Sequence, residues 1–178
     1  MVQRTPTYGL PWVEPSDTPV TYPTISQELA TDVEAAVKTY QARYYRGTAF
    51  TFPATGNQVV NPFIYTTKVF DTGNRYNTAT GLYTCPVAGL YMVRASLSFT
   101  ASAASQTLNC GINVNGTNDT IIFAYSTGAG AMHSQAVALV QCNAGDTISV
   151  QAACSLASGV LRASPAESAL HIAYLGQA

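Results

Sequence analysis

The chain has 178 residues, of which 47% are hydrophobic and only 10% are charged, and its formal net charge is −1. Soluble domains usually carry about 25% charged residues, so this composition suggests that partner subunits cover much of the surface. Binding of nucleic acid through phosphates needs clustered Lys and Arg, and the eight basic residues form no cluster, so we expect no nucleic-acid partner. No run of 18 apolar residues exists and the start lacks the apolar segment of a signal peptide, so we expect no membrane association and no leader.

Residues 1–23 are expected to form an extended docking arm. Five of the nine prolines of the chain fall here, at positions 6, 11, 15, 19 and 23, and this spacing excludes a helix and favours polyproline-like backbone. The arm also holds the only Trp of the chain, which a solvated linker does not need. The candidate anchors for docking on another protein are Tyr8, Leu10, Pro11, Trp12, Val13 and Tyr22. A terminal tail without fixed structure is the alternative.

The second segment, residues 24–47, is expected to be an amphipathic helix. The helix covers residues 24–46, and Gly47 ends it. Thr24 and Gln27 fit a capping box, and acids early and bases late in the segment complement the helix dipole. The apolar stripe comprises Leu29, Val33, Ala36, Val37, Tyr40 and Tyr44. A helix with so narrow a stripe is marginal alone. It packs either on a threefold axis or on the flank of its own domain, and the sequence leaves both open.

Residues 48–178 are expected to form a β domain, because short strand patterns alternate with turns. The expected strands cover 49–52, 64–71, 81–85, 90–100, 107–114, 120–125, 134–142, 146–154 and 168–175. Asn115-Gly116 between two apolar-alternating runs is the strongest hairpin signal.

Five short motifs follow one another in this domain. They are Ala49-Phe50-Thr51-Phe52, Tyr76 before a turn, Tyr83-Thr84-Cys85-Pro86, Gly89-Leu90-Tyr91, and Gly145-Asp146 before an alternating strand. In this order they resemble the globular head of the complement q-subcomponent, one of the tumour-necrosis-factor-like trimeric jelly rolls. The resemblance implies a mainly β fold, a ten-stranded-type jelly-roll sandwich, that forms a homotrimer without enzymatic activity. It also implies that Phe50, Tyr91 and Tyr174 lie near the subunit contacts.

The sequence shows no catalytic constellation, and we expect no enzyme, no metal and no cofactor. Only two histidines occur, His133 and His171, and we expect His171 to be a packed or interface residue. The four cysteines lack the CxxC spacing of zinc sites, and we expect buried thiols, with disulfides as the alternative. Three Ala/Ser/Gly-rich loops offer few anchors for recognition, and the candidate exposed positions are Ser102, Tyr125, Ser126 and Ser158.

The segments TYGLPW and ELATDVEAAV resemble the N-terminal parts of minor tail proteins from phages of actinobacteria. This second resemblance implies a virion protein made in the bacterial host cytoplasm. Its arm would dock on other virion proteins, and its jelly-roll head would project from the tail or tail tip toward host-surface glycans. A capsid decoration protein and a bacterial spore or cell-surface adhesin are the alternatives, and the sequence does not separate tail from capsid.

Overall fold

The computed structural model describes residues 3–4, 11–12, 40–52, 58–101, 106–125, 129–155 and 160–177. The chain divides into two compact units, Met1–Lys38 and Thr39–Ala178. In the first unit, β1 (Gln3–Arg4) pairs antiparallel with β2 (Pro11–Trp12). The backbone expected to be extended is therefore extended at these four residues. The expected helix as far as residue 39 and the other arm anchors lie outside the described residues, so both remain predictions.

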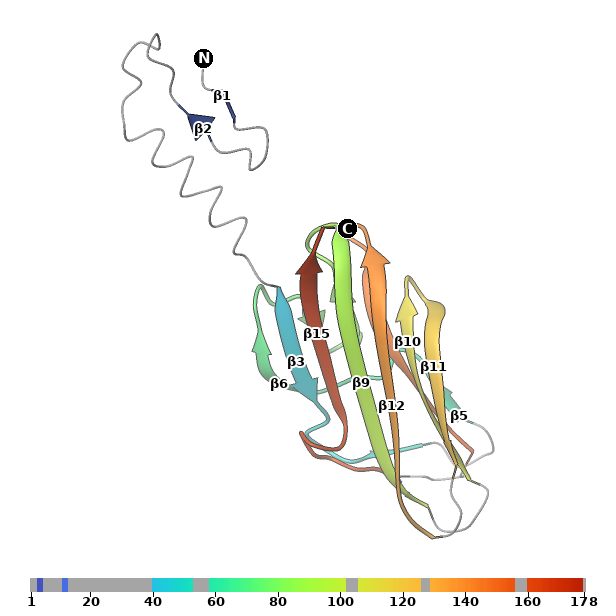
Figure 1. The fold of residues 1–178 in the computed structure, drawn as a ribbon. Coiled ribbons are helices and arrows are strands. Elements are labelled where there is room, and N and C mark those ends of the chain that lie inside the picture. The colour runs from blue at the N-terminus through green and yellow to red at the C-terminus, as the bar shows by residue number, and fades with distance from the viewer. Residues whose placement is uncertain are drawn as a thin grey trace. The chain divides into compact units, whose positions relative to one another are not determined.

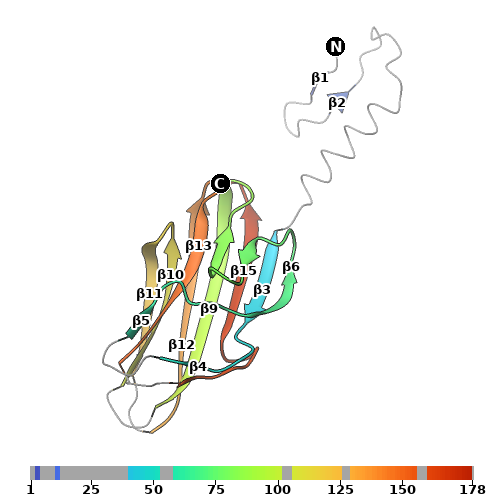
Figure 2. The ribbon, with the colours of Figure 1, turned by 180° about the vertical axis from the view of Figure 1, so that it is seen from behind.

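The second unit is a sandwich of two antiparallel sheets (Figures 1 and 2). The first, called the β10 sheet, has the order β11–β10–β13–β8–β7, with β5 beside β13. Its strands are β5 (Gln58–Val60), β7 (Tyr76–Asn77), β8 (Leu82–Thr84), β10 (Thr107–Val114), β11 (Thr117–Tyr125) and β13 (Thr147–Cys154).

The second, called the β9 sheet, has the order β4–β14–β9–β15–β3–β6, with β12 beside β9. Its strands are β3 (Gln41–Tyr45), β4 (Phe50–Thr51), β6 (Thr67–Asp71), β9 (Gly89–Ala101), β12 (Gly130–Cys142), β14 (Val160–Leu161) and β15 (Ala169–Gly176). The described residues contain no helix, and so none that is long and apolar enough to cross a membrane.

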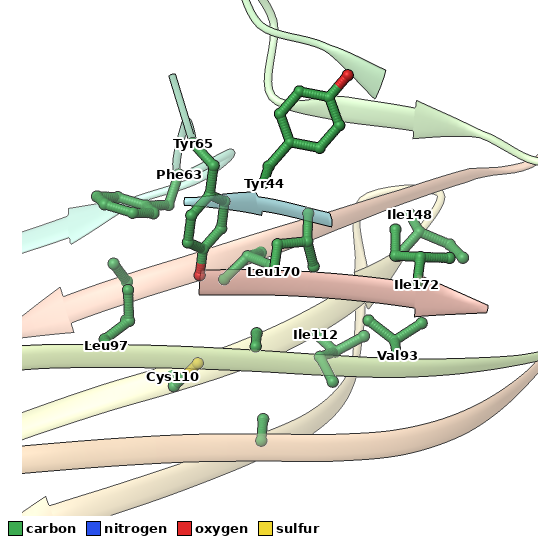
Figure 3. Close-up of a cluster of buried hydrophobic side chains, with 14 of the residues drawn as sticks. Tyr44, Phe63, Tyr65, Val93, Leu97, Cys110, Ile112, Ile148, Leu170 and Ile172 are labelled. Atoms are coloured by element: carbon green, nitrogen blue, oxygen red, sulfur yellow. The ribbon is translucent and has the colours of Figure 1, made fainter. Parts of the chain in front are cut away.

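The core lies between the two sheets and consists of the side chains at every second position of their strands. Along β9 every second side chain is buried, from Tyr91 through Val93, Ala95 and Leu97 to Phe99. Figure 3 shows side chains of both sheets converging, with Ile112 and Ile148 from the β10 sheet and Val93 and Ile172 from the β9 sheet. Each fully buried side chain of this size stabilises the fold by about 1.5–3 kcal/mol.

The β10–β11 hairpin confirms the turn predicted at Asn115-Gly116. Both residues have positive φ, 50° and 77°, which is the backbone of a two-residue hairpin turn that matches the twist of the flanking strands. Asn and Gly adopt this conformation more readily than other residues. The strand expected over 107–114 is β10 with the same bounds.

Gly89 and Tyr91 explain the Gly-x-Tyr motif at the start of β9. Gly89 has φ 148°, and a side chain there would collide with the carbonyl of Gly176 and would lie 2.7 Å from the ring of Tyr174. The Tyr91 hydroxyl donates a hydrogen bond to the Val87 carbonyl at 2.7 Å. The glycine therefore lets β15 end against β9, and the tyrosine fixes the turn that leads into the strand.

Residues 41–45 correct the expected extent of the helix, because they form strand β3, which pairs with β15 and β6. The β unit accordingly begins at residue 39 rather than at 48. Tyr40 and Tyr44, four residues apart, fit a helical stripe, yet they also fit a strand with a period of two. The strand is the more stable conformation, because it buries Ala42 and Tyr44 in the sandwich and lets the Tyr44 hydroxyl donate a hydrogen bond to Asp71 at 3.0 Å.

Truncation of Tyr91 should reveal how much the ring and the hydroxyl each stabilise the sandwich. The ring is 0% exposed and packs between Tyr83 and Tyr174, so Tyr91→Ala should lower the free energy of unfolding by about 3–5 kcal/mol. Tyr91→Phe loses only the hydroxyl's two hydrogen bonds with the Val87 carbonyl and amide and should cost about 1 kcal/mol. Denaturant titration measures both, and a cost below about 1 kcal/mol for Tyr91→Ala would contradict the burial.

Candidate functional site

The residues expected at subunit contacts occupy different environments. Tyr44 and Tyr91 are fully inside the sandwich, because the strand alternation turns both inward, so their side chains are not available to a neighbouring subunit. Phe50 and Tyr174 are half-buried and pack against the core. Of the expected recognition positions, Ser102, Ser126 and Ser158 lie outside the described residues, and Tyr125 is exposed at the end of β11.

A groove lies on the outer face of the β10 sheet, where strands β5, β13, β10 and β11 run side by side (Figure 2). The strand registers place Val59, Ala153, Asn109 and Phe123 in one row across these four strands. In the adjacent row Thr107 is the partner of Tyr125. The groove encloses about 250 Å³, with the small Ala153 at its floor and larger side chains on either side.

Aromatic rings and hydroxyl and amide groups line this groove, and none of the described residues that line it is charged. Phe123 is 53% exposed and Tyr125 is 68% exposed. The Asn109 Oδ1 atom is buried and has no hydrogen-bond partner, a state that costs free energy unless a ligand or water donates to it. The Thr107 amide donates to the Ser155 hydroxyl at 2.7 Å, which fixes the polar end of the groove. Such a groove suits a neutral ligand with apolar faces and hydroxyl donors.

The residue pattern pointed to loops as the recognition positions, and of the residues that line this groove it predicted only Tyr125. It missed Asn109 and Phe123, which lie on strands and become neighbours only through the register of β10 with β11. A usable signal existed, because the run from Ile121 to Tyr125 is apolar at every position. A strand that is buried on one face only should alternate with polar residues.

The outer face of the β9 sheet is a second candidate surface, called the β9 face. Its exposed apolar side chains come from neighbouring strands, and they are Phe70, Met92, Val137, Leu139 and Leu175. Met92 is the register partner of Leu139 on β12 and of Ala173 on β15. Clusters of exposed apolar side chains of this kind mark interaction surfaces.

His171 also lies on the β9 face, half-buried, between its register partners Arg43 and Arg94. Burial and the two guanidinium groups lower the pKa of His171 from its ordinary value, because all three effects disfavour a further positive charge. Its half-buried position is compatible with the expected packed residue, and its place in an interface stays a prediction. His133 lies on β12 and is exposed.

The chemistry of the described residues gives no support for catalysis. They contain no group of three or more His, Cys, Asp or Glu side chains that could hold a metal ion. The cysteines Cys85, Cys110, Cys142 and Cys154 are all buried, and none forms a disulfide. Burial raises the pKa of Cys110 to about 12, so its thiol is a poor nucleophile at neutral pH.

Comparison with known proteins identifies the fold. Residues 48–170, more than half of the chain, match the family model of the C1q domain. The globular domain of zebrafish complement 1qA protein is 13% identical with a TM-score of 0.56, over 76% of this chain and 96% of that chain. Murine APRIL at pH 5.0 is 14% identical with a TM-score of 0.55, over 78% and 100%.

Eiger TNF from S. frugiperda is 12% identical with a TM-score of 0.53, over 79% of this chain and 94% of that chain. No curated protein sequence matches the chain. The expected fold, a mainly β sandwich of the complement and tumour-necrosis-factor-like jelly-roll type, is therefore confirmed for the β unit. At these identities the solved structures show the fold alone.

The buried thiols should be inert in the folded protein. Burial raises the pKa of Cys85, Cys110 and Cys142 above the ordinary value, so the thiolate fraction at pH 8 is very small. A chromogenic disulfide reagent at pH 8 should therefore label none of the four thiols of the native chain quickly and all four after unfolding in denaturant. Rapid labelling of the native chain would contradict the burial of at least one cysteine.

Proposed function

This chain belongs to the C1q domain family, and we propose that it is a non-enzymatic homotrimer that serves as a bacteriophage virion protein. The family supports the homotrimer, and the resemblance of the N-terminal segments to phage tail proteins supports the virion role. The N-terminal unit anchors it to other virion proteins, and the jelly-roll head projects from the tail or tail tip and contacts the host surface. The single observation that carries the assembly is the β9 face, whose apolar side chains are 41–61% exposed.

The β9 face supports self-association because of what it exposes and what surrounds it. Met92 on β9 and its register partner Leu139 on β12 face outward side by side. β9 lies between β12 and β15, so outward side chains of three neighbouring strands contribute to this face. Burial of this apolar area against two neighbouring copies would stabilise the trimer by about 25 cal/mol for each Å² removed from water.

The anchoring role rests on the sequence of the N-terminal unit. Its extended backbone at Gln3–Arg4 and Pro11–Trp12 and its apolar residues are what a segment needs to bind along another protein. The unit is separate from the β unit in the chain, so docking and presentation are divided between the two. The resemblance of TYGLPW and ELATDVEAAV to phage tail proteins supports a virion as the docking site.

The groove on the β10 sheet favours host attachment over a purely structural role. Aromatic rings such as Phe123 and Tyr125 present flat apolar faces that suit the C–H faces of sugars, and Asn109 Oδ1 accepts from a hydroxyl. We therefore propose a neutral saccharide of the host surface as the ligand. A capsid decoration protein needs no ligand groove, while a spore or cell-surface adhesin would use the same groove from another location.

A matched pair of charge substitutions tests the trimer. Leu139 on the β9 face is 61% exposed, and Val59 in the groove is 60% exposed. Leu139→Glu should place an unpaired charge in the subunit interface and raise the dissociation constant of the trimer by about 100-fold or more. Val59→Glu should leave a trimer. Light scattering at micromolar concentration measures both, and a monomeric wild-type chain would refute the assembly.

Alanine substitutions in the groove test attachment. Phe123→Ala and Tyr125→Ala should each weaken binding of the trimer to host cells by about tenfold, because each removes an aromatic platform. Val160→Ala, which removes an exposed side chain outside the groove, should leave binding unchanged. Cell binding and a glycan array measure the effect. If the wild-type trimer binds no host cell while particles that lack the protein become fragile, the decoration role is correct.

Truncation of the arm tests the anchor. Deletion of residues 1–23 should leave a folded trimer, because the β unit begins at Thr39, and this trimer should fail to join virions. Trp12→Ala should weaken incorporation about 30-fold, since a buried Trp anchor contributes about 2 kcal/mol. Copy number in purified particles is the measurement. Normal copy number of the truncated protein would place the docking surface elsewhere.

A further inference from the structure

Three basic side chains form one row across the β9 face. His171 on β15 is in register with Arg43 on β3 and with Arg94 on β9. Adjacent strands lie about 4.8 Å apart, so the two arginines flank the histidine within about 10 Å. Their chain neighbours Ala42, Val93 and Ile172 are buried, and the alternation of each strand therefore directs all three basic side chains outward.

The row has no counter-charge within the β unit. The sequence from 39 onward contains four acids, Asp71, Asp119, Asp146 and Glu167. Asp71 accepts from Tyr44 and Tyr76, Asp119 from Thr120, Asp146 from Asn115 and Asn143, and Glu167 pairs with Arg162. None of these contacts involves the row. Arg43 and Arg94 are like charges on either side of His171, and without a nearby carboxylate a negative charge between them would relieve their repulsion.

The surroundings of the row also favour a bound negative charge. Phe70 continues the row beyond Arg43, and Val137 continues it beyond Arg94, so both ends are apolar. Arg94 donates to the neutral side chain of Gln135 at 2.9 Å. The Nε atom of Arg43 is buried and has no hydrogen-bond partner, which is costly for a charged donor.

We propose that Arg43, His171 and Arg94 bind a small oxyanion of the sulfate or phosphate type on the β9 face. Guanidinium groups donate paired N–H bonds that match the spacing of oxyanion oxygens, and Arg43 Nε supplies a donor that is otherwise unsatisfied. The enclosure of the anion between subunits rests on the proposed trimer, whereas the donors come from one chain. The anion then acts as a counter-ion that allows an apolar face with three basic groups to be buried.

Thermal unfolding of the full chain tests the site, with sodium sulfate as the probe and chloride replaced at constant ionic strength. Sulfate in the low millimolar range should raise the Tm of the wild type saturably, by on the order of 3 °C at ten times its Kd. Arg43→Gln and Arg94→Gln should each abolish most of this rise. The control Arg75→Gln, at an exposed position outside the row, should keep it.

Sulfate could also raise the Tm only as a general stabilising salt. The Tm would then rise equally in the wild type and in all the variants, and this result would overturn the proposal. In chloride alone, Arg94→Gln should be at least as stable as the wild type, since it relieves repulsion in the row. Isothermal titration with sulfate supplies a second readout that does not depend on stability, and absence of saturable heat with the wild type would also overturn the site.

The dependence on pH gives an independent signature. The charged groups that face His171 are Arg43 from β3 and Arg94 from β9, while β6 and β12 contribute Phe70 and Val137. A bound anion opposes the effect of the arginines and raises the pKa of His171, so binding takes up a proton. Sulfate stays fully ionised from pH 5.5 to 8, and the Tm rise should be larger at pH 5.5. His171→Gln should remove this difference.

Failure of the site and failure of the proposed trimer are distinguishable. Light scattering in chloride reports the oligomeric state without reference to the anion. A trimer whose Tm responds equally to sulfate in the wild type and in Arg94→Gln would overturn the anion site alone. A monomer that shows the expected difference between these proteins would keep the anion site and overturn the trimer.

Discussion

The alternation of β9 is the constraint on which the rest of the structure depends. This 13-residue strand pairs with β12 along its whole length, and with β15 and β14 on its other side. Because the buried apolar side chains of β9 recur at every second position from Tyr91 to Phe99, a register slip of one residue would move Tyr91, Val93 and Leu97 out of the core. The register of β9 therefore fixes its neighbours, and through β15 it also fixes β3 and β6.

The same alternation creates the two candidate binding surfaces. The residues that face outward from β9 and its neighbours include Met92 and Arg94, and their environment is set by register rather than by sequence separation. On the β10 sheet, the outward row from Val59 to Phe123 joins residues that are 64 positions apart. One face combines apolar and basic groups, and the other is neutral and concave, so the two sheets suit different partners.

The sequence predicted those parts of the fold in which local signals and long-range pairing agree. β10 and its Asn115-Gly116 turn are examples, because a clean alternation and a turn with positive φ both appear in the chain. β3 was mispredicted, since Tyr40 and Tyr44 fit helical spacing and only pairing with β15 decides in favour of a strand. The groove could not be predicted from single segments, because Asn109 lies beside Ala153 and Phe123 only through the pairing of three strands.

This division between inward and outward residues also explains how solved structures that are only 12–14% identical to this chain have the same fold. The core requires apolar side chains of suitable size at alternate positions and tolerates exchange among them. The outward positions are released from that requirement, because a change at Arg94 or Phe123 leaves the inward pattern intact. The fold is therefore inherited through the inward residues, and binding is decided by the outward ones. A shared fold does not identify the ligand of this chain. The evidence for its partners therefore comes from its own outward residues, namely the Arg43–His171–Arg94 row and the aromatic groove.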